Sequence, residues 1–327
     1  MAKGFEAAVE LKPVDALEVV ILVDNVSDAL LASSEVARRP AFSLNSETDQ
    51  LLAEHGYSLL LTVERDGTRQ SILYDAGFTR HTALHNLDVL GVKVDQLRAI
   101  ALSHGHADHH GGLSGMVSRI GRRAMPLVLH PDAWLERKIV FPDGREIPAP
   151  PPSAADLARE DVQVIEERGP TLLIDGCVLV TGQVERKTDF EPGFPIQYRR
   201  RGHSWEPDYM VWDDQGVIIE VAGKGLVVMS SCSHSGVINV LRNARRLTGV
   251  DKLHAFVGGC HLTGAIMEPV IPRTLEEMSA LASTTSLPAT ARAGKPLTSW
   301  PAGFRAPSSR AASAPRFASD FLQGSTR

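Results

Sequence analysis

The stretch Ser103–Gly112, SHGHADHHGG, places four histidines and one aspartate within ten positions, directly after the apolar run LRAIALS (97–103). Such a run predicts a buried strand. His104 and His106 are two residues apart, and side chains at that spacing point to the same side of an extended backbone. Imidazole nitrogens and carboxylate oxygens are ligands that zinc prefers. The stretch therefore predicts a metal site at the end of a strand.

Asp108 and His109 follow where the chain begins to turn. Because their side chains differ in reach, they can hold a second ion beside the first, and Asp108 is our candidate catalytic residue. A catalytic zinc keeps one position open for water and lowers the pKa of that water to about 7. Gly111 and Gly112 are expected to let the backbone turn tightly. A solvated polar turn is the alternative, and the HxHxDH spacing at a strand end disfavours it.

Two further histidines stand at the ends of predicted strands. The stretch 216–234 predicts two strands that end at His234, and 253–261 predicts a strand that ends at His261. Strands outnumber helices early in the chain and alternate with them later, which is typical of a layered α/β protein with mixed sheets covered by helices. The proline-rich stretch 141–153 predicts an exposed loop or lid.

Composition limits the possible partners. The 327 residues carry a formal charge of −5 with a pI near 6.2, so no basic field favours nucleic acid or an anionic membrane. A small-molecule substrate is the expectation, and oligomeric state is not indicated. Three widely spaced cysteines suit a reducing compartment. The sequence has no signal-peptide pattern and no run of about 18 apolar residues, so we expect a cytoplasmic protein.

The motif THxHxDHxGG is the hallmark of the metallo-β-lactamase superfamily, and SHGHADHHGG matches it except at Ser103. Other stretches resemble one branch, the 7,8-dihydropterin-6-ylmethyl-4-(β-D-ribofuranosyl)aminobenzene 5′-phosphate synthase type, although Ser231 replaces a glycine usual there. The resemblance covers about residues 17 to 280. The matching stretches are ILVDN (21–25), EHGYSLLL (54–61), ILYDAG (72–77), TGQVERKTDFE (181–191), GKGLVVMSSCSHSGVINVL (223–241) and VGGCHL (257–262).

The resemblance implies an αββα sandwich over 17–280 with two divalent metal ions, zinc first and manganese, iron or magnesium as alternatives. It leaves open whether His234 or His261 is the third ligand, and the alternative for His261 is a contact with the substrate. Cys232 either approaches the metals or packs as a small apolar residue. The implied metal ligands are His104, His106, Asp108, His109, His234 and His261; Asp75 would buttress the metal loop, and His55, Arg186 and Glu191 would line the substrate pocket.

The segment 281–327 differs in kind, since 31 of its 47 residues are Ala, Ser, Thr, Pro or Gly. A disordered tail is one reading. The branch, however, ends with a strand carrying the motif PGHCTGWKA, whose histidine is the last metal ligand. Thr290–Pro296 can be encoded by the codons for His-Cys-Thr-Gly-Trp-Lys-Ala read one nucleotide late. We therefore hypothesise a frameshift near 278–282, which would leave the last strand and helix missing or non-native.

Three functions remain open at this point. The first is a dinuclear enzyme acting on a phosphorylated or pterin-like small molecule, with metal-bound hydroxide as nucleophile or the metals as Lewis acids. The second is a generic hydrolase of esters, thioesters or phosphodiesters on the same fold. The third is an inactive or weakened metal-binding remnant, because the last histidine ligand would be lost.

Overall fold

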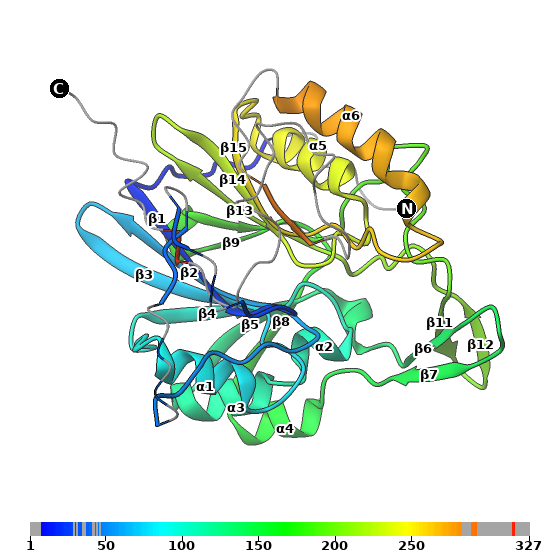
Figure 1. The fold of residues 1–327 in the computed structure, drawn as a ribbon, viewed down its shortest axis with the longest axis horizontal. Helices are drawn as coiled ribbons and strands as arrows, with labels where there is room; N and C mark the ends of the chain where they lie inside the picture. The colour runs from blue at the N-terminus through cyan, green and yellow to red at the C-terminus, as the bar shows by residue number, and fades with distance from the viewer. Residues whose placement is uncertain are drawn as a thin grey trace.

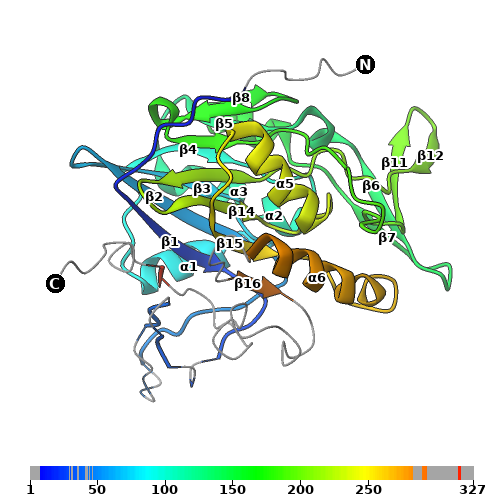
Figure 2. The same ribbon diagram turned by 90° about the horizontal axis from the view of Figure 1, so that it is seen from above.

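The computed structural model describes residues 8–282 apart from 29, 31, 35, 36, 41, 42, 44 and 46, together with 289–292 and 316–317. Two central sheets face each other, and helices cover their outer faces (Figures 1 and 2). This is the αββα arrangement that the sequence predicts, and a third, smaller sheet projects beside it.

The first central sheet has the strand order β17-β1-β2-β3-β4-β5-β8. Its hairpins pair antiparallel from β1 to β3, whereas β3, β4, β5 and β8 pair in parallel. The central parallel strands β4 and β5 are mostly apolar because they are buried on both faces, whereas the edge strand β8 contains exposed polar residues. The bounds are β1 Ala16–Val23, β2 Ser58–Arg65, β3 Thr68–Tyr74, β4 Leu97–Ala101, β5 Met125–Leu129, β8 Val162–Glu166 and β17 Arg316–Phe317.

The second central sheet has the order β16-β15-β14-β13-β10-β9. The pairs β14·β15 and β15·β16 are parallel, so the chain leaves β14 and β15 at the same edge of the sheet. The bounds are β9 Thr171–Leu173, β10 Val178–Val180, β13 Val217–Val221, β14 Gly225–Ser230, β15 Leu253–Gly259 and β16 Ala289–Arg292.

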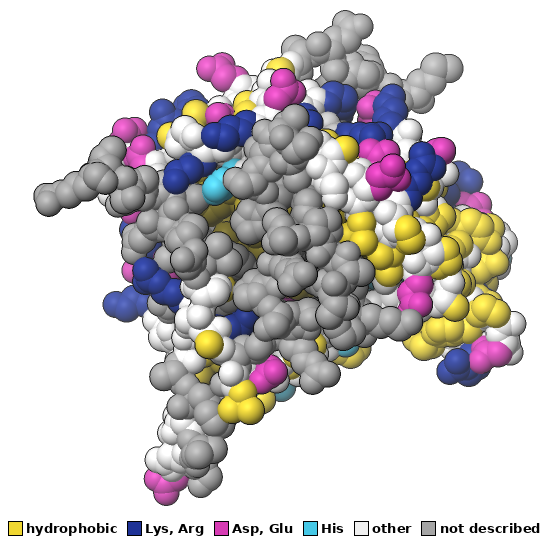
Figure 3. Space-filling view, turned by 45° about the horizontal axis from the view of Figure 1, so that its top comes forward, with side chains coloured by type: hydrophobic (Ala, Val, Ile, Leu, Met, Phe, Trp, Pro, Cys, Tyr) yellow, Lys and Arg dark blue, Asp and Glu magenta, His cyan; other side chains and the backbone are white. Residues whose placement is uncertain are grey.

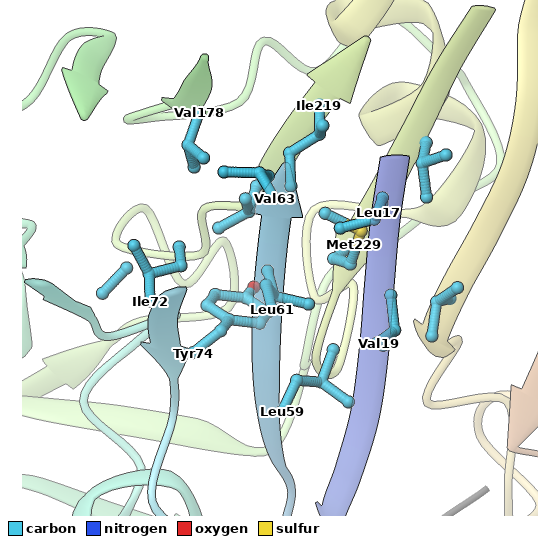
Figure 4. Close-up of a cluster of buried hydrophobic side chains, with 14 of the residues drawn as sticks. Leu17, Val19, Leu59, Leu61, Val63, Ile72, Tyr74, Val178, Ile219 and Met229 are labelled. Atoms are coloured by element: carbon cyan, nitrogen blue, oxygen red, sulfur yellow. The ribbon is translucent and has the colours of Figure 1, made fainter. Parts of the chain in front are cut away.

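Three apolar cores hold these layers together. The middle core lies between the sheets, where side chains of β1, β2 and β3 face those of β10, β13 and β14 (Figure 4). The outer cores attach α1, α3 and α4 to the first sheet and α5 and α6 to the second. The helix bounds are α1 Thr82–Val89, α2 Ala107–His110, α3 Leu113–Ile120, α4 Ala154–Arg159, α5 Val237–Thr248 and α6 Ile271–Ala282, and the short 3-10 turns are η1 Pro131–Trp134, η2 Ile174–Gly176 and η3 Glu268–Val270.

A four-stranded sheet, β12-β11-β6-β7, stands apart from the sandwich (Figure 1). Hydrophobic side chains gather on the right-hand side of Figure 3, the side on which this sheet lies in Figure 1. Ile147 and Trp205 are large exposed hydrophobic residues of this sheet. Its strands are β6 Arg137–Val140, β7 Glu146–Ala149, β11 Gln197–Arg201 and β12 Ser204–Pro207.

The prediction that 141–153 is only a loop or lid was wrong, because β7 forms within it. The turn at 141–145 joins β6 to β7, and Pro148 pairs with Lys138 in the antiparallel register. β7 is an edge strand, where the missing N–H of a proline is tolerated. The proline-rich stretch therefore contains an edge strand and the segment by which the chain leaves the sheet.

The C-terminal segment contributes two strands to the described structure. Residues 289–292 form β16 beside β15, so a strand stands where we expected it to be missing or non-native; among the described residues no helix follows it. The rest of 283–327, apart from β17, lies outside the described residues. The out-of-frame origin stays a prediction about the gene. Sequencing that region again tests it, and an unbroken frame without a nearby insertion or deletion would contradict it.

Candidate metal centre

Histidines from three strand ends meet at one edge of the sandwich. His104 and His106 follow β4, His234 follows β14, and His261 follows β15. The ring centroids of His104 and His234 are 4.8 Å apart, and those of His234 and His261 are 4.6 Å apart. His109, from α2, lies 4.3 Å from His104. The two central sheets thus bring together residues more than 150 positions apart in sequence.

One group of converging ligand atoms consists of His104, His106 and His234. All three side chains are buried, and their ligand atoms lie within 4.8 Å of one another. His104 Nε2 and His106 Nδ1 are 2.9 Å apart, as the two-residue spacing predicted. His261 packs against His234, but neither group of converging atoms found among the described residues includes it. The geometry therefore favours His234 as the third ligand.

The first loop, residues 103–112, follows β4 and contains His104, His106 and His109. Each of these three rings is oriented by a hydrogen bond to one of its nitrogens. His104 Nδ1 is 2.8 Å from Ser103 Oγ, and His109 Nδ1 is 2.7 Å from Asp75 Oδ2. His106 Nε2 hydrogen-bonds the side-chain oxygen of Gln197. Metal-binding histidines are held in this way, with one nitrogen bonded outward and the other directed at the ion.

His234 provides the test of whether a cation fits. Its side chain is buried, and neither ring nitrogen has a hydrogen-bond partner among the residues that the structure describes. A buried polar atom left without a partner costs about 1–3 kcal/mol. Burial and the neighbouring His261 lower the pKa of His234 well below its usual value, so the ring is neutral and offers a lone pair. The donor set of three neutral imidazoles fits a divalent ion such as zinc.

A second group gathers around His109. The Nε2 atom of His109 lies 3.2 Å from Cys232 Sγ and 3.3 Å from Asp108 Oδ2. His104, His109 and Cys232 have ligand atoms within 4.8 Å of one another. Burial would raise the pKa of Asp108, but His109 and its neighbours hold that pKa below its usual value. Asp108 is therefore a carboxylate that can share a cation with His109.

Asp75, which was predicted to buttress the metal-binding loop, hydrogen-bonds residues of both loops. It accepts hydrogen bonds from Ser103 N and Ser103 Oγ, both at 2.7 Å. It also accepts one from the hydroxyl of Ser231 in the second loop, residues 231–236, which follows β14. Its φ of 61° is in the left-handed region, which is strained for a residue other than glycine. The surrounding hydrogen bonds hold this strained conformation in place.

The residues that the resemblance assigned to a substrate pocket lie close by, and two of them hold the second loop. Arg186 donates to the carbonyl of His234 at 2.9 Å. Glu191 accepts from the backbone N–H groups of Ile238 and Asn239 at the start of α5, so both its oxygens are engaged. His55 is exposed, and its Nε2 lies 3.4 Å from Asp108 Oδ2.

Gly111 and Gly112, which follow the histidine cluster, lie very close to another segment of the backbone. Gly111 and Gly112 both have right-handed backbone angles, so neither provides the special turn that we expected. A Cβ at Gly111 would lie 1.8 Å from the carbonyl oxygen of Phe78, and one at Gly112 would lie 2.1 Å from that of Ala76. Only glycine lets the metal loop pack this closely on the chain that follows β3.

Sequence reasoning missed the contribution of the third sheet. Gln197 begins β11, and the buried Arg137 begins β6, where its guanidinium bonds Asp208 at 2.8 Å and Asp213 at 2.6 Å. Asp213 in turn accepts from Gly105 N, between the two paired histidines, at 2.8 Å. No periodicity or motif in these polar segments signals such roles. The third sheet therefore anchors the metal loop.

Comparison with known proteins places this geometry in a family. Residues 53–247 match the Metallo-beta-lactamase superfamily. The chain is 29% identical over 226 residues to the 7,8-dihydropterin-6-methyl-4-(beta-D-ribofuranosyl)-aminobenzene-5′-phosphate synthase of Methanocaldococcus jannaschii, which covers 67% of this chain and 74% of the relative. An uncharacterised protein of the same organism is 29% identical over 221 residues, with 67% of this chain and 77% of that protein covered.

A solved structure shares the fold. It is described as Tm1679, a metal-dependent hydrolase of the beta-lactamase superfamily, and it superposes with a TM-score of 0.60 at 22% identity over 81% of this chain and 84% of that chain. None of the helices in the described part of the chain is long and apolar enough to cross a membrane. With the sandwich, the histidine cluster and the sequence match in agreement, the chain belongs to the metallo-beta-lactamase superfamily.

Proposed function

We propose that this protein is a metal-dependent enzyme that acts on a small phosphorylated or pterin-like substrate. The observation that carries the metal dependence is His234, a buried imidazole that lies next to His104 and His106. Neither of its ring nitrogens has a hydrogen-bond partner in the part of the chain that the structure describes. The substrate class is supported by the similarity to the dihydropterin-type synthase, at 29% identity. A pair of divalent ions, zinc first, is the expected cofactor.

The charge around the site supports an anionic substrate. Arg186 lies against the loop of His234, and its Nε is buried without a hydrogen-bond partner in the described part of the chain. Burial lowers the pKa of this guanidinium, but an arginine keeps its charge at neutral pH. A phosphate or carboxylate group of a substrate would satisfy such a donor. Electrostatics thus favours a negatively charged ligand over a neutral one.

Some residues of the site would hold the metal ions, and others fix the side chains that hold them. His104, His106 and His234 would hold one ion, and Asp108 with His109 would hold another. Asp75 and Gln197 fix the rings of His109 and His106, so little reorganisation is needed when ligands bind. A divalent ion bound here would supply Lewis acidity and would activate water. Asp108, partly exposed, lies where a substrate would meet the site.

A substrate screen tests the proposal. Metal-stripped protein is reloaded with Zn²⁺ or Mn²⁺ and offered phosphorylated and pterin-like compounds beside simple esters, thioesters and phosphodiesters. We expect metal-dependent turnover of the first group and none in His234→Ala. Turnover confined to the simple esters would favour a generic hydrolase instead. Stoichiometric metal binding without turnover of any compound would favour an inactive remnant.

A further inference from the structure

We propose that Phe194 determines substrate specificity: its ring, with Ile139 and Ile147 of the third sheet, forms an apolar wall beside the metal cluster against which a flat ring of the substrate packs. The inference rests on the proposed function, because it needs a metal-bound anionic substrate, and it names a second group that this substrate carries. Ligand sites are commonly lined by hydrophobic and aromatic side chains, with a few polar groups that fix orientation.

The ring of Phe194 lies against three histidines of the cluster. Its centroid is 5.3 Å from that of His234, with 28° between the two planes, so these rings are stacked. The rings of His261 and His106 meet Phe194 at steep angles, with centroid distances of 4.9 Å and 6.0 Å. His106 and His234 are buried, whereas Phe194 is half-buried. A ligand that approaches His234 along the third sheet therefore meets the ring of Phe194 first.

The main chain fixes Phe194 in this place. Its N–H donates to the carbonyl of Tyr209 at 2.6 Å, and its own carbonyl accepts from Gln197 N at 3.1 Å. Gly193, with φ of 79°, packs so closely that a Cβ there would lie 2.2 Å from the same Tyr209 oxygen. The ring is therefore a fixed boundary of the cluster. The cluster is more open on the side of Asp108, whose side chain is 18% exposed.

The apolar wall continues across the inner face of the third sheet. Gln197 hydrogen-bonds His106, so this face is turned toward the cluster. Ile139 of β6 pairs directly with Gln197, and Ile147 of β7 pairs directly with Ile139. Residues that are directly paired lie on the same face of a sheet. Gln197 is buried, Ile139 is half-buried and Ile147 is 48% exposed, so the row leads from the cluster out to solvent.

A phenylalanine beside two isoleucines selects for a flat, apolar part of a ligand. Aromatic rings pair at centroid distances of about 4.5–7 Å, and such pairs stabilise a complex beyond the area that they bury. None of the three side chains has a hydrogen-bonding group, so this wall recognises shape and not charge. Arg186 and the metals would recognise an anion on the same molecule. The expected ligand therefore joins a planar ring to an anionic group.

The test is calorimetry of zinc-loaded full-length protein with phenylphosphonate and with methylphosphonate. These two probes share an anionic group, differ by a flat ring, and contain no phosphate ester that could be hydrolysed. We expect wild type and Phe194→Tyr to bind phenylphosphonate about tenfold more tightly than methylphosphonate. Phe194→Leu should reduce this preference to about twofold, with the zinc affinity of wild type. Tyr198→Leu removes an aromatic ring from the opposite face of β11 and should keep the full preference.

Four results overturn the inference. Wild type could bind the two phosphonates equally, Phe194→Leu could keep the full preference, or Tyr198→Leu could lose it to the same extent. The fourth is a loss of zinc affinity in Phe194→Leu with the preference intact, which would make the ring mere packing for the histidines.

Two further readouts keep the outcomes distinct. If Phe194→Leu does not fold, Ile139→Thr decides, because it keeps a β-branched side chain in the strand. It should weaken phenylphosphonate about threefold and leave methylphosphonate unchanged, and an equal effect on both overturns the inference. If zinc binds but neither phosphonate does, the anionic substrate of the proposed function fails together with this inference. If zinc does not bind, the metal dependence fails as well.

Discussion

The two loops that form the metal cluster are built differently. In the first loop, each of His104, His106 and His109 has one ring nitrogen bonded to Ser103, Gln197 or Asp75. In the second loop, Arg186 binds the backbone carbonyl of His234, while neither ring nitrogen of His234 has a hydrogen-bond partner among the described residues. The first loop is thus preorganised by protein groups. The second needs a cation to satisfy its histidine.

Removing the unsatisfied histidine should have the largest effect. His234→Ala deletes a direct ligand, and loss of partners outside the ligand shell alone costs about 10–100-fold in affinity or activity. We therefore expect a fall of more than about 100-fold in zinc affinity, measured by competition with a chromogenic chelator. His203→Ala, an exposed histidine in the third sheet, is the matched control and should bind as wild type does. Unchanged affinity in His234→Ala would remove the second loop from the site.

Asp75→Asn should follow in size. It weakens the contact that orients His109 and the bonds that join Ser103 to Ser231. The expected loss of zinc affinity is about 10–100-fold, concentrated in one of two binding steps in calorimetry. Asp66→Asn, in the exposed β2–β3 turn, controls for the lost charge. If both variants weaken binding equally, the effect is net charge and not orientation.

Gln197→Ala should have a smaller effect, about tenfold, because His106 keeps its place in the loop and loses only its outer partner. The variant also tests whether the third sheet belongs to the site. Gln163→Ala, at an exposed position of β8, is the control. If Gln197→Ala binds zinc with the affinity of wild type, the third sheet does not contribute to the metal site.

The smallest effect is a difference in protection between the two loops. Saturating zinc at about 100 times its dissociation constant should stabilise the fold by about 2.7 kcal/mol. Amide hydrogen exchange should slow more in 231–236 than in 103–110, because protein groups already hold the histidine rings of the first loop, whereas the ring nitrogens of His234 have no partner among the described residues. Equal slowing in both loops would show that the second loop is no less preorganised than the first.

The sequence predicted that the side chains of His104 and His106 lie together, because their two-residue spacing alone indicates this geometry. The layered α/β class was predicted because apolar runs mark the strands, and the αββα sandwich that the family resemblance implied was confirmed. Gln197, Arg137 and Asp213 escaped prediction because each comes from a polar segment whose role exists only after the third sheet docks. Glu191 was predicted to line the substrate pocket; in the structure its carboxylate accepts a hydrogen bond from the backbone N–H of Ile238 at the start of α5.

The most direct test of the two-loop account is diffraction from zinc-loaded crystals at the zinc absorption edge. We expect one anomalous peak within bonding distance of His104, His106 and His234, and a second within bonding distance of Asp108 and His109. Peaks absent from this edge of the sandwich, or bound by the first loop without any residue of the second, would contradict it.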